Sequence, residues 1–337
     1  LGDVYKRQLS ILRKGSIMLE KFFKLSENHT DAKTEILAGI TTFMTMAYIL
    51  AVNPSIMAAT GMDSGAVFTA TALAAFIGTL LMAIFANYPF ALAPGMGLNA
   101  YFAYTVVIGM GYTWQYALTA VFAEGIIFIL LSLTNVREAI FNAIPMNLKS
   151  AVSVGIGLFI AFVGLQNAHI VVGGSTLLQL FSVDAYNKAN GVEASFNNVG
   201  ITVILALAGI IITGILVVKN IKGNILWGIL ITWGLGIICQ FAGLYVPNAD
   251  LGFYSLLPDF SKGLSIPSLT PIFGKLQFKG IFSVDFIVIL FAFLFVDLFD
   301  TIGTLVGVSA KADMLDEEGK LPHIKGALLA DAVATTV

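Results

Sequence analysis

Long, uninterrupted runs of apolar residues dominate the pattern of this chain. Seven runs are long enough to cross a bilayer, which requires about 20 residues: 36–58, 66–87, 114–134, 150–167, 199–218, 223–245 and 283–308. An eighth run, 94–109, is shorter, and a ninth begins near Lys325 and reaches Val337. Membrane β-strands alternate apolar and polar residues over about 10 positions, so these continuous runs predict helices.

The charged residues lie almost entirely outside these runs. Of the 337 residues, 58% are hydrophobic and 11% are charged, whereas a typical soluble domain carries about 25% charge. The eight runs contain four charges, Glu124, Asp285, Asp297 and Asp300, and no Lys or Arg. This composition excludes a soluble enzyme, a nucleic-acid-binding protein and a disordered chain. With a single cysteine, Cys239, a disulfide scaffold is excluded as well. The sequence predicts an all-α polytopic membrane protein.

The distribution of Lys and Arg predicts the orientation. With the N-terminus inside, the inner segments carry 14 Lys and Arg and the outer segments carry 4. Since inner loops are enriched in these residues, we expect residues 18–35 to be cytoplasmic and residues 168–198 and 246–282 to be extracytoplasmic. This count requires the short run 94–109 to be a crossing.

The two ends suggest a fragment with an added leader. The chain begins without Met, and Met18 is a plausible start, so we expect residues 1–17 to be a non-native leader. The ninth run is too short to cross a bilayer, and we therefore expect a C-terminally truncated chain.

The segment FLFVDLFDTIGTLVG, residues 293–307, carries the strongest chemical signal. Asp297, Asp300, Thr301 and Thr304 are spaced i, i+3, i+4 and i+7, which places them on one helical face. An ionised Asp costs ~2.5–3.5 kcal/mol at the centre of a membrane helix, and two carboxylates one turn apart repel each other. Such a pair indicates a ligand, a proton or a watered cavity. A polar clamp between helices is the structural alternative.

Residues 88–111, YPFALAPGMGLNAYFAYTVVIGMG, predict a broken helix. Two prolines and two glycines before Leu98 oppose a continuous helix, so we expect a short extended strand at 88–93 and a helix from near Leu98 to about Ile108. A helix that begins inside the membrane offers free N–H groups and the positive end of its dipole. Asn99 in its first turn adds an amide. A substrate site is favoured over a packing kink.

Other polar residues leave more than one interpretation open. Glu124 either contacts a neighbouring helix or carries protons. The pair Asn53-Pro54 predicts a helix end, His169 an interfacial position, and 136–149 a short amphipathic interfacial helix. The run SVGIG, 153–157, indicates close helix packing. No His, Cys or carboxylate cluster has metal-ligand spacing, and no P-loop is present.

At these motifs the sequence resembles the nucleobase–cation symporter 2 group and, within it, the AzgA-like adenine/guanine/hypoxanthine permeases. The resemblance covers about residues 18–337 and is carried by the segments 39–57, 93–107, 153–168 and 293–308. It implies a transporter and not an enzyme, with a 7+7 inverted-repeat fold of which about the first eight or nine helices are present. It also implies a core domain (36–135 and 283–337) and a gate domain (136–245), with 246–282 as the loop between the repeats.

The resemblance also implies roles for individual residues. Asp297 would be the main purine-binding carboxylate, and Asp300 would support it and couple protons together with Asp297. Asn99, Gly97 and Thr301 would complete this half of the substrate site, while a family glutamate on helix 10 would lie beyond Val337. No metal and no cofactor are implied.

The favoured hypothesis is a proton symporter that imports hypoxanthine, guanine or adenine across the inner or plasma membrane, with H⁺ preferred over Na⁺ and with a homodimer as an expected assembly. A transporter of an anion or another organic solute with the same fold is the alternative; two Asp and no buried Lys or Arg oppose an anion. An intramembrane aspartyl protease is a third hypothesis. It is disfavoured because such a dyad joins two helices, and these two Asp lie on one.

Overall fold

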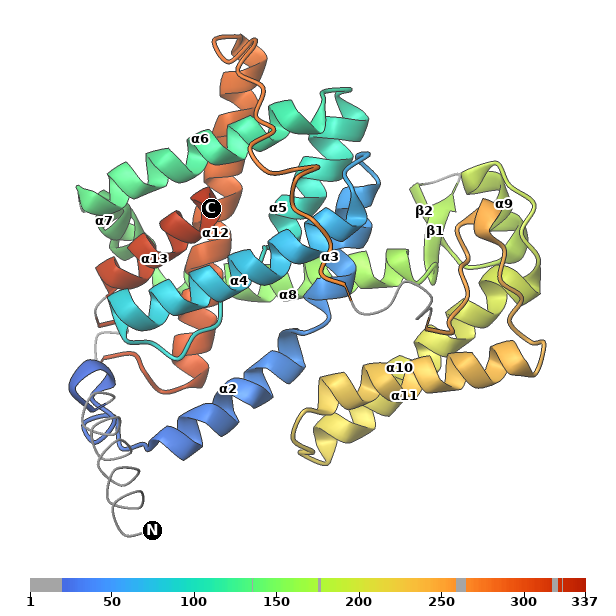
Figure 1. Cartoon of the computed structure of the whole chain (residues 1–337), viewed down its shortest axis with the longest axis horizontal. Helices are drawn as coiled ribbons and strands as arrows, with labels where there is room; N and C mark the ends of the chain where they lie inside the picture. The colour runs from blue at the N-terminus through green and yellow to red at the C-terminus, as the bar shows by residue number, and fades with distance from the viewer. Residues whose placement is uncertain (1–19, 135, 175–176, 259–264, 317–320, 323) are drawn as a thin grey trace. The chain divides into compact units, whose positions relative to one another are not determined.

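Helices account for nearly all of the regular structure in the computed structural model (Figure 1). The structure describes residues 20–134, 136–174, 177–258, 265–316, 321–322 and 324–337, so the expected leader 1–17 lies outside the described residues. Seven described helical segments are long and apolar enough to cross a membrane. These helices confirm the prediction of a largely helical protein with several membrane spans.

The helices follow the predicted runs closely. In chain order they are α2 (Ala32–Met46), α3 (Ile49–Ala58), α4 (Ser64–Ala86), α5 (Met96–Ala100), η1 (Tyr101–Gly109), α6 (Trp114–Leu133), α7 (Val136–Ala143), α8 (Met146–Asn167), α9 (Val183–Asn190), η2 (Phe196–Gly200), α10 (Ile201–Val218), α11 (Asn224–Phe241), η3 (Ala249–Leu251), α12 (Val284–Lys311) and α13 (Ile324–Thr336).

The first predicted run forms two consecutive helices instead of one. Asp31 caps α2 by accepting a hydrogen bond from the backbone N–H of Thr34 at 2.7 Å, and a turn at Ala47–Tyr48 leads into α3. The expectation that Asn53-Pro54 ends the helix is wrong, because Pro54 lies inside α3. Membrane helices tolerate an internal proline where neighbouring groups satisfy the freed backbone.

The segment 88–111, which contains the short run 94–109, is broken as predicted. Residues 87–95 form neither helix nor strand, and the helix then runs from Met96 to Gly109, first as α5 and then as the π-helical η1. The expected strand at 88–93 is not formed. A strand needs a partner, and here the N–H and C=O of Leu92 are instead bonded to the Thr79 hydroxyl at 3.0 and 3.3 Å.

The polar segment 168–198 contains more structure than the sequence predicted. The strands β1 (Val171–Gly174) and β2 (Leu177–Leu180) form an antiparallel hairpin in which Val171 pairs with Leu180, and α9 and η2 follow. The prediction of an all-α fold is therefore wrong for this hairpin. Strands of four residues are too short to show a clear alternation in the sequence.

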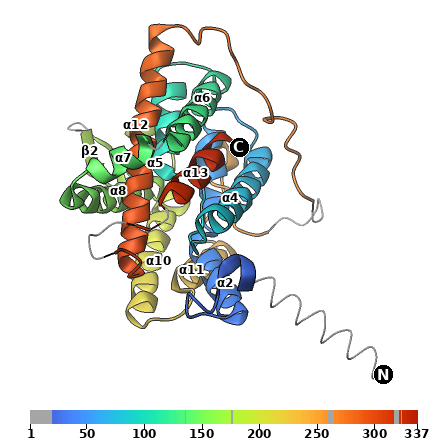
Figure 2. The same cartoon turned by 90° about the vertical axis from the view of Figure 1, so that its left-hand side faces the viewer.

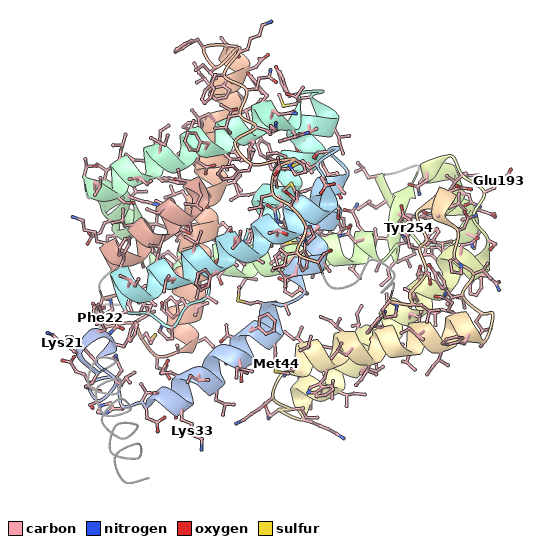
Figure 3. The ribbon with its side chains drawn as sticks, viewed as in Figure 1. Lys21, Phe22, Lys33, Met44, Glu193 and Tyr254 are labelled. Atoms are coloured by element: carbon pink, nitrogen blue, oxygen red, sulfur yellow. The ribbon has the colours of Figure 1, made fainter. Side chains whose placement is uncertain are left out.

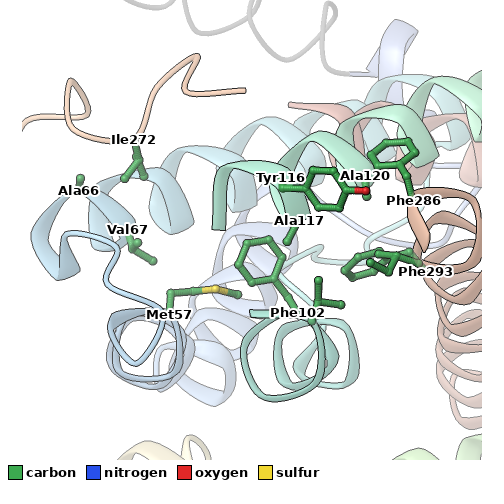
Figure 4. Close-up of a cluster of buried hydrophobic side chains, with 12 residues drawn as sticks. Met57, Ala66, Val67, Phe102, Tyr116, Ala117, Ala120, Ile272, Phe286 and Phe293 are labelled. Atoms are coloured by element: carbon green, nitrogen blue, oxygen red, sulfur yellow. The ribbon is translucent and has the colours of Figure 1, made fainter. Parts of the chain in front are cut away.

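The chain divides into two compact units, of which the first comprises the residues up to Ile156 and Pro267–Val337. In this unit α13 packs against both α4 and α6 and lies between them (Figures 1 and 2). A buried apolar cluster joins α3, α4, η1, α6 and α12 (Figure 4), and its larger members are Met57, Phe102, Tyr116, Phe286 and Phe293.

Small residues set the approach of α12 to the first half of α8. A Cβ added at Gly303 would lie 2.7 Å from Ile156 Cδ1, and one added at Gly307 would lie 2.5 Å from Ser153 Oγ. The spacing of these glycines, four residues apart, is the one that lets membrane helices pack closely. The packing role expected for 153–157 is confirmed at Ser153, whereas a Cβ added at Gly155 would meet no atom of the described residues within 4 Å.

The second unit spans Gly157–Ile266. Its helices α10 and α11 pack against each other, and a buried cluster that includes Val172, Tyr186, Val199, Tyr245 and Phe253 lies at the hairpin, α9 and η2. Figure 3 shows the side chains of both units, with Glu193 and Tyr254 labelled in this one. Many large apolar side chains of α10 and α11 are exposed, as expected for helices that face lipid.

Candidate functional site

The predicted acidic helix presents its polar face to the interior of the first unit. Ser283 caps α12 by accepting a hydrogen bond from Phe286 N–H at 3.1 Å. Four turns further along, Asp297 and Thr301 are 4% and 6% exposed. Asp300 is half-buried and Thr304 is exposed. Of the residues predicted to share one helical face, Asp297 and Thr301 are therefore buried, whereas Thr304 is exposed to solvent or lipid.

Asp300 meets the chain where the broken helix begins. A Cβ added at Gly95 would lie 2.7 Å from Asp300 Oδ2, so a larger residue at this position would displace the carboxylate. Gly95 immediately precedes α5, and Gly97 lies in its first turn. The structure thus brings the acidic helix and the start of the broken helix together, as the sequence interpretation requires.

Asn99 belongs to a chain of buried polar side chains. Its Nδ2 donates to Asn53 Oδ1 at 2.7 Å, and Asn53 Nδ2 donates to Thr71 Oγ1 at 2.7 Å. All three side chains are at most 7% exposed. Asn53, which the sequence analysis interpreted as a helix end, therefore fixes the orientation of the Asn99 amide from α3.

Arg137 is fully buried, in contrast to the interfacial position predicted for its helix. It lies on the short α7, which was expected to be interfacial, yet its side chain has no exposed surface. One Nη donates to the carbonyl oxygen of Leu328 at 2.8 Å, and the other donates to Asp331 Oδ2 at 2.6 Å and to Thr301 Oγ1 at 3.0 Å. Its guanidinium also lies 4.1 Å from the ring centroid of Phe128. The statement that no Lys or Arg is buried is wrong.

Asp331 of α13 was not recognised from the sequence. Its Oδ2 accepts hydrogen bonds from Arg137 and, at 2.9 Å, from the Thr301 hydroxyl. Thr301, expected to bind substrate, is thus engaged in linking α12 to α13 and α7. The sequence signal for it is a single carboxylate inside the apolar run after Lys325.

Glu124 completes the group of charged residues. It lies in α6 with no exposed surface, and neither carboxylate oxygen has a hydrogen-bond partner among the described residues. The charged side chains that act on it are Asp297, Arg137 and Asp331. We call Glu124, Arg137, Asp297, Asp300 and Asp331 the acidic cluster, since it contains four carboxylates and one cation.

The acidic cluster can accept hydrogen bonds and hold protons. Ionised carboxylates are acceptors with no donor to offer, so they suit a ligand that presents N–H groups. Among the described residues, no group of three or more His, Cys, Asp or Glu could hold a metal ion. The chemistry that this arrangement supports is recognition of a polar, N–H-bearing solute together with proton exchange.

Comparison with known proteins decides the family. The sequence model of the Permease family, which covers xanthine and uracil permeases, matches residues 33–337. The chain belongs to this permease family. This is the nucleobase–cation symporter 2 group that the sequence resembles, a family of transporters and not of enzymes. A multi-pass membrane protein follows from this membership and from the apolar helices together.

Several relatives within the permease family are similar over almost the whole chain. A putative permease of Methanocaldococcus jannaschii is 47% identical over 95% of this chain and 67% of its own length. A guanine/hypoxanthine permease of Bacillus subtilis is 43% identical over 94% and 67% of the two chains. An adenine permease of Escherichia coli is 38% identical over 95% and 66%. The chain thus spans about two thirds of the length of these relatives.

Proposed function

We propose that this permease imports purine nucleobases, with hypoxanthine, guanine and adenine as its substrate class, by proton symport. The observation that supports it most is that relatives 38–43% identical over nearly the whole chain are named guanine/hypoxanthine and adenine permeases. The buried Asp297 and the half-buried Asp300 supply the acceptors that a purine with ring and exocyclic N–H groups requires.

Each residue of the proposed substrate site would have its own role in binding the base. Asp297 accepts hydrogen bonds from the base, and Asp300 supports it beside the start of the broken helix. Gly97 and Asn99 form the neighbouring edge, with the Asn99 amide oriented by Asn53. Thr301 contributes indirectly, because its hydroxyl is bonded to Asp331 and Arg137.

The remaining features of the proposal concern the whole transporter. A 7+7 inverted repeat with core and gate domains would provide alternating access in the inner or plasma membrane. The N-terminus would be cytoplasmic, and a homodimer is the expected assembly. The proton gradient would supply the energy without a cofactor, and the proton would be held by the acidic cluster around Asp297 and Asp300.

Uptake of radiolabelled hypoxanthine by cells that lack their own purine permeases tests this proposal. Asp297→Asn removes a hydrogen bond to a charged group, which is worth ~1.5–3 kcal/mol, so we expect affinity to fall roughly 10- to 100-fold. The matched control is Asp285→Asn, an exposed position in the first turn of the same helix. Equal uptake by wild type and Asp297→Asn would contradict the role of Asp297.

A transporter of an anion or another organic solute is the second candidate, because Arg137 places one cation among the carboxylates. Its Nη atoms, however, already donate to Leu328, Thr301 and Asp331. Competition of hypoxanthine uptake by xanthine, uracil or sulfate discriminates the two candidates. Strong inhibition by sulfate alone would favour the anion.

A further inference from the structure

Within the acidic cluster, Glu124 and Asp297 differ from the other two carboxylates, Asp331 and Asp300, in their surroundings. Asp331 is bonded to Arg137 and Thr301, and Asp300 is half-buried beside Gly95. Glu124 and Asp297 are both buried, and three of their four carboxylate oxygens, Glu124 Oε1 and Oε2 and Asp297 Oδ2, have no hydrogen-bond partner among the described residues. Glu124 lies on α6 and Asp297 on α12, two helices that pack against each other, and each of the two carboxyl groups interacts with the other.

If Glu124 and Asp297 were both ionised, neither could donate a hydrogen bond to the other. Each offers acceptors and no donor, and ionised carboxylates away from water are costly unless they are paired. Arg137 makes no hydrogen bond to the pair: its Nη atoms donate to Leu328, Thr301 and Asp331, and its Nε has no partner among the described residues. A single proton turns one carboxylate into a donor, so that one hydrogen bond joins the two groups and removes one of their two charges.

Among the described residues, three charged groups from neighbouring helices act on Glu124. Asp297 comes from α12, Arg137 from α7 and Asp331 from α13. The π-helix η1 also contacts α6, and its titratable side chains are Tyr101 and Tyr104, neither of them charged at neutral pH. The charge of the pair therefore depends on the proton it holds, on Asp300, which acts on Asp297, and on Arg137 and Asp331, which compensate each other.

We infer that Glu124 and Asp297 share one exchangeable proton, and that Glu124 is the group that keeps this proton while Asp297 binds the base. When a base donates an N–H to Asp297, the proton rests on Glu124 as the neutral acid. When the base leaves, the O–H bond of Glu124 breaks and the proton passes to water on the inner side. The pair then takes up another proton from water on the outer side and holds it until the next base binds. One proton then accompanies each base. This coupling rests on the proposed function, whereas the shared proton does not.

The decisive variant is Glu124→Gln, which mimics the protonated acid and cannot release a proton. We expect loss of hypoxanthine accumulation driven by a pH gradient and a flat pH profile of uptake, while exchange of labelled for unlabelled hypoxanthine is retained. The matched control is Glu193→Gln, an exposed position in the second unit (Figure 3), which should leave accumulation and its pH profile unchanged.

A second measurement does not depend on transport. Infrared spectroscopy of the purified chain at neutral pH should show the carbonyl stretch of a buried protonated carboxyl group, which shifts on exchange into D₂O and is lost in Glu124→Gln. If Glu124→Gln fails to fold, the wild-type spectrum and that of Asp297→Asn still decide, because Asp297→Asn should shift the same band.

The outcomes separate the two proposals. A wild-type pH profile and full accumulation in Glu124→Gln would overturn the inference, as would a wild-type spectrum without a protonated carboxyl band. Uptake that depends on Na⁺ and not on pH would also overturn it. Absence of purine uptake by wild type would contradict the proposed function, and with it the coupling, while a carboxyl band sensitive to Glu124→Gln would still establish the shared proton.

Discussion

Arg137 shows how a single residue can connect elements that are distant in the sequence. It lies on an eight-residue helix whose composition suggests a membrane surface, but its guanidinium links α7 to α12 and α13 through three hydrogen bonds. The planar guanidinium offers five donors, which is why one side chain can serve a carbonyl, a hydroxyl and a carboxylate together.

Removing only one partner of the Arg137–Asp331 ion pair should destabilise the protein. Arg137→Leu leaves Asp331 without its cation and Thr301 Oγ1 without the donor from which it accepts, and loss of one partner of a buried ion pair costs about 3–5 kcal/mol. We expect a clearly lower unfolding temperature of the purified protein in detergent. The double variant with Asp331→Leu should recover much of the loss, since no uncompensated charge remains. Lys33→Leu, an exposed cation on α2 (Figure 3), serves as control. Equal unfolding temperatures of wild type and Arg137→Leu would contradict this account.

His169 gives the second unit a pH-dependent stability. Its ring packs against those of Tyr186 and Phe253, with centroids 4.9 and 6.1 Å apart, and burial lowers the pKa of His169 below its ordinary value of 6.5. The unfolded chain therefore binds a proton at a higher pH than the folded chain, so stability is lost as pH falls below about 6.5.

His169→Phe should remove this part of the pH dependence. Phe keeps the ring contacts and has no proton to bind, so its unfolding temperature should vary less between pH 7.5 and pH 5.5, both about one unit from the ordinary histidine pKa. The exposed His29→Phe is the matched control and should leave the dependence as in wild type. A dependence equal to that of wild type in His169→Phe would exclude His169 as its source.

At the scale of elements, the first unit is organised by α13 packing between α4 and α6. Small residues allow this approach on both sides. A Cβ added at Gly78 of α4 would lie 3.0 Å from Ala334 Cβ, and one added at Gly125 of α6 would lie 2.9 Å from Thr336 Cα. Because Glu124 adjoins Gly125, the packing of α13 also determines what surrounds the unpartnered carboxyl group.

Gly125→Leu should therefore disturb both stability and transport. Overpacking of a close contact costs about 1–3 kcal/mol, and the displaced helix would carry Glu124 away from Asp297. We expect a lower unfolding temperature and reduced hypoxanthine uptake. Gly155→Leu is the control, since its added Cβ would meet nothing within 4 Å. Equal losses in both variants would show that helix propensity, and not the contact with α13, is responsible.

At the scale of the whole molecule, orientation in the bilayer remains a prediction from the distribution of Lys and Arg. With 14 of these residues on one side and 4 on the other, residues before α2 should face the cytoplasm, and residues 168–198 and 246–282 should face the outside.

Cysteine labelling in intact cells tests this orientation. In a Cys239→Ser background, a membrane-impermeant maleimide should label Glu193→Cys and Tyr254→Cys in intact cells, because both positions are exposed and lie in the predicted outer segments (Figure 3). Lys21→Cys and Lys33→Cys should be labelled only after permeabilisation. The reverse pattern would invert the predicted topology.

The apolar runs determined most of the architecture by themselves. The membrane spans follow from hydrophobicity, and the break before α5 follows from proline and glycine. The shared face of Asp297 and Thr301 follows from the helical repeat. All three depend on residues that are neighbours in the chain. The β-hairpin and the division of the first run into α2 and α3 did not follow, because they depend on short segments whose local preferences are weak.

What the sequence could not determine is which charges meet. Asp297 and Asp300 are three residues apart, so their spacing alone relates them, whereas Glu124, Arg137 and Asp331 lie on three other helices and their distances depend on how those helices pack. Arg137 looked interfacial because its immediate neighbours are polar. Only the tertiary structure places it beside Asp331 and leaves Glu124 with Asp297, since the approach of α13, α6 and α12 is decided by contacts between residues far apart in the chain.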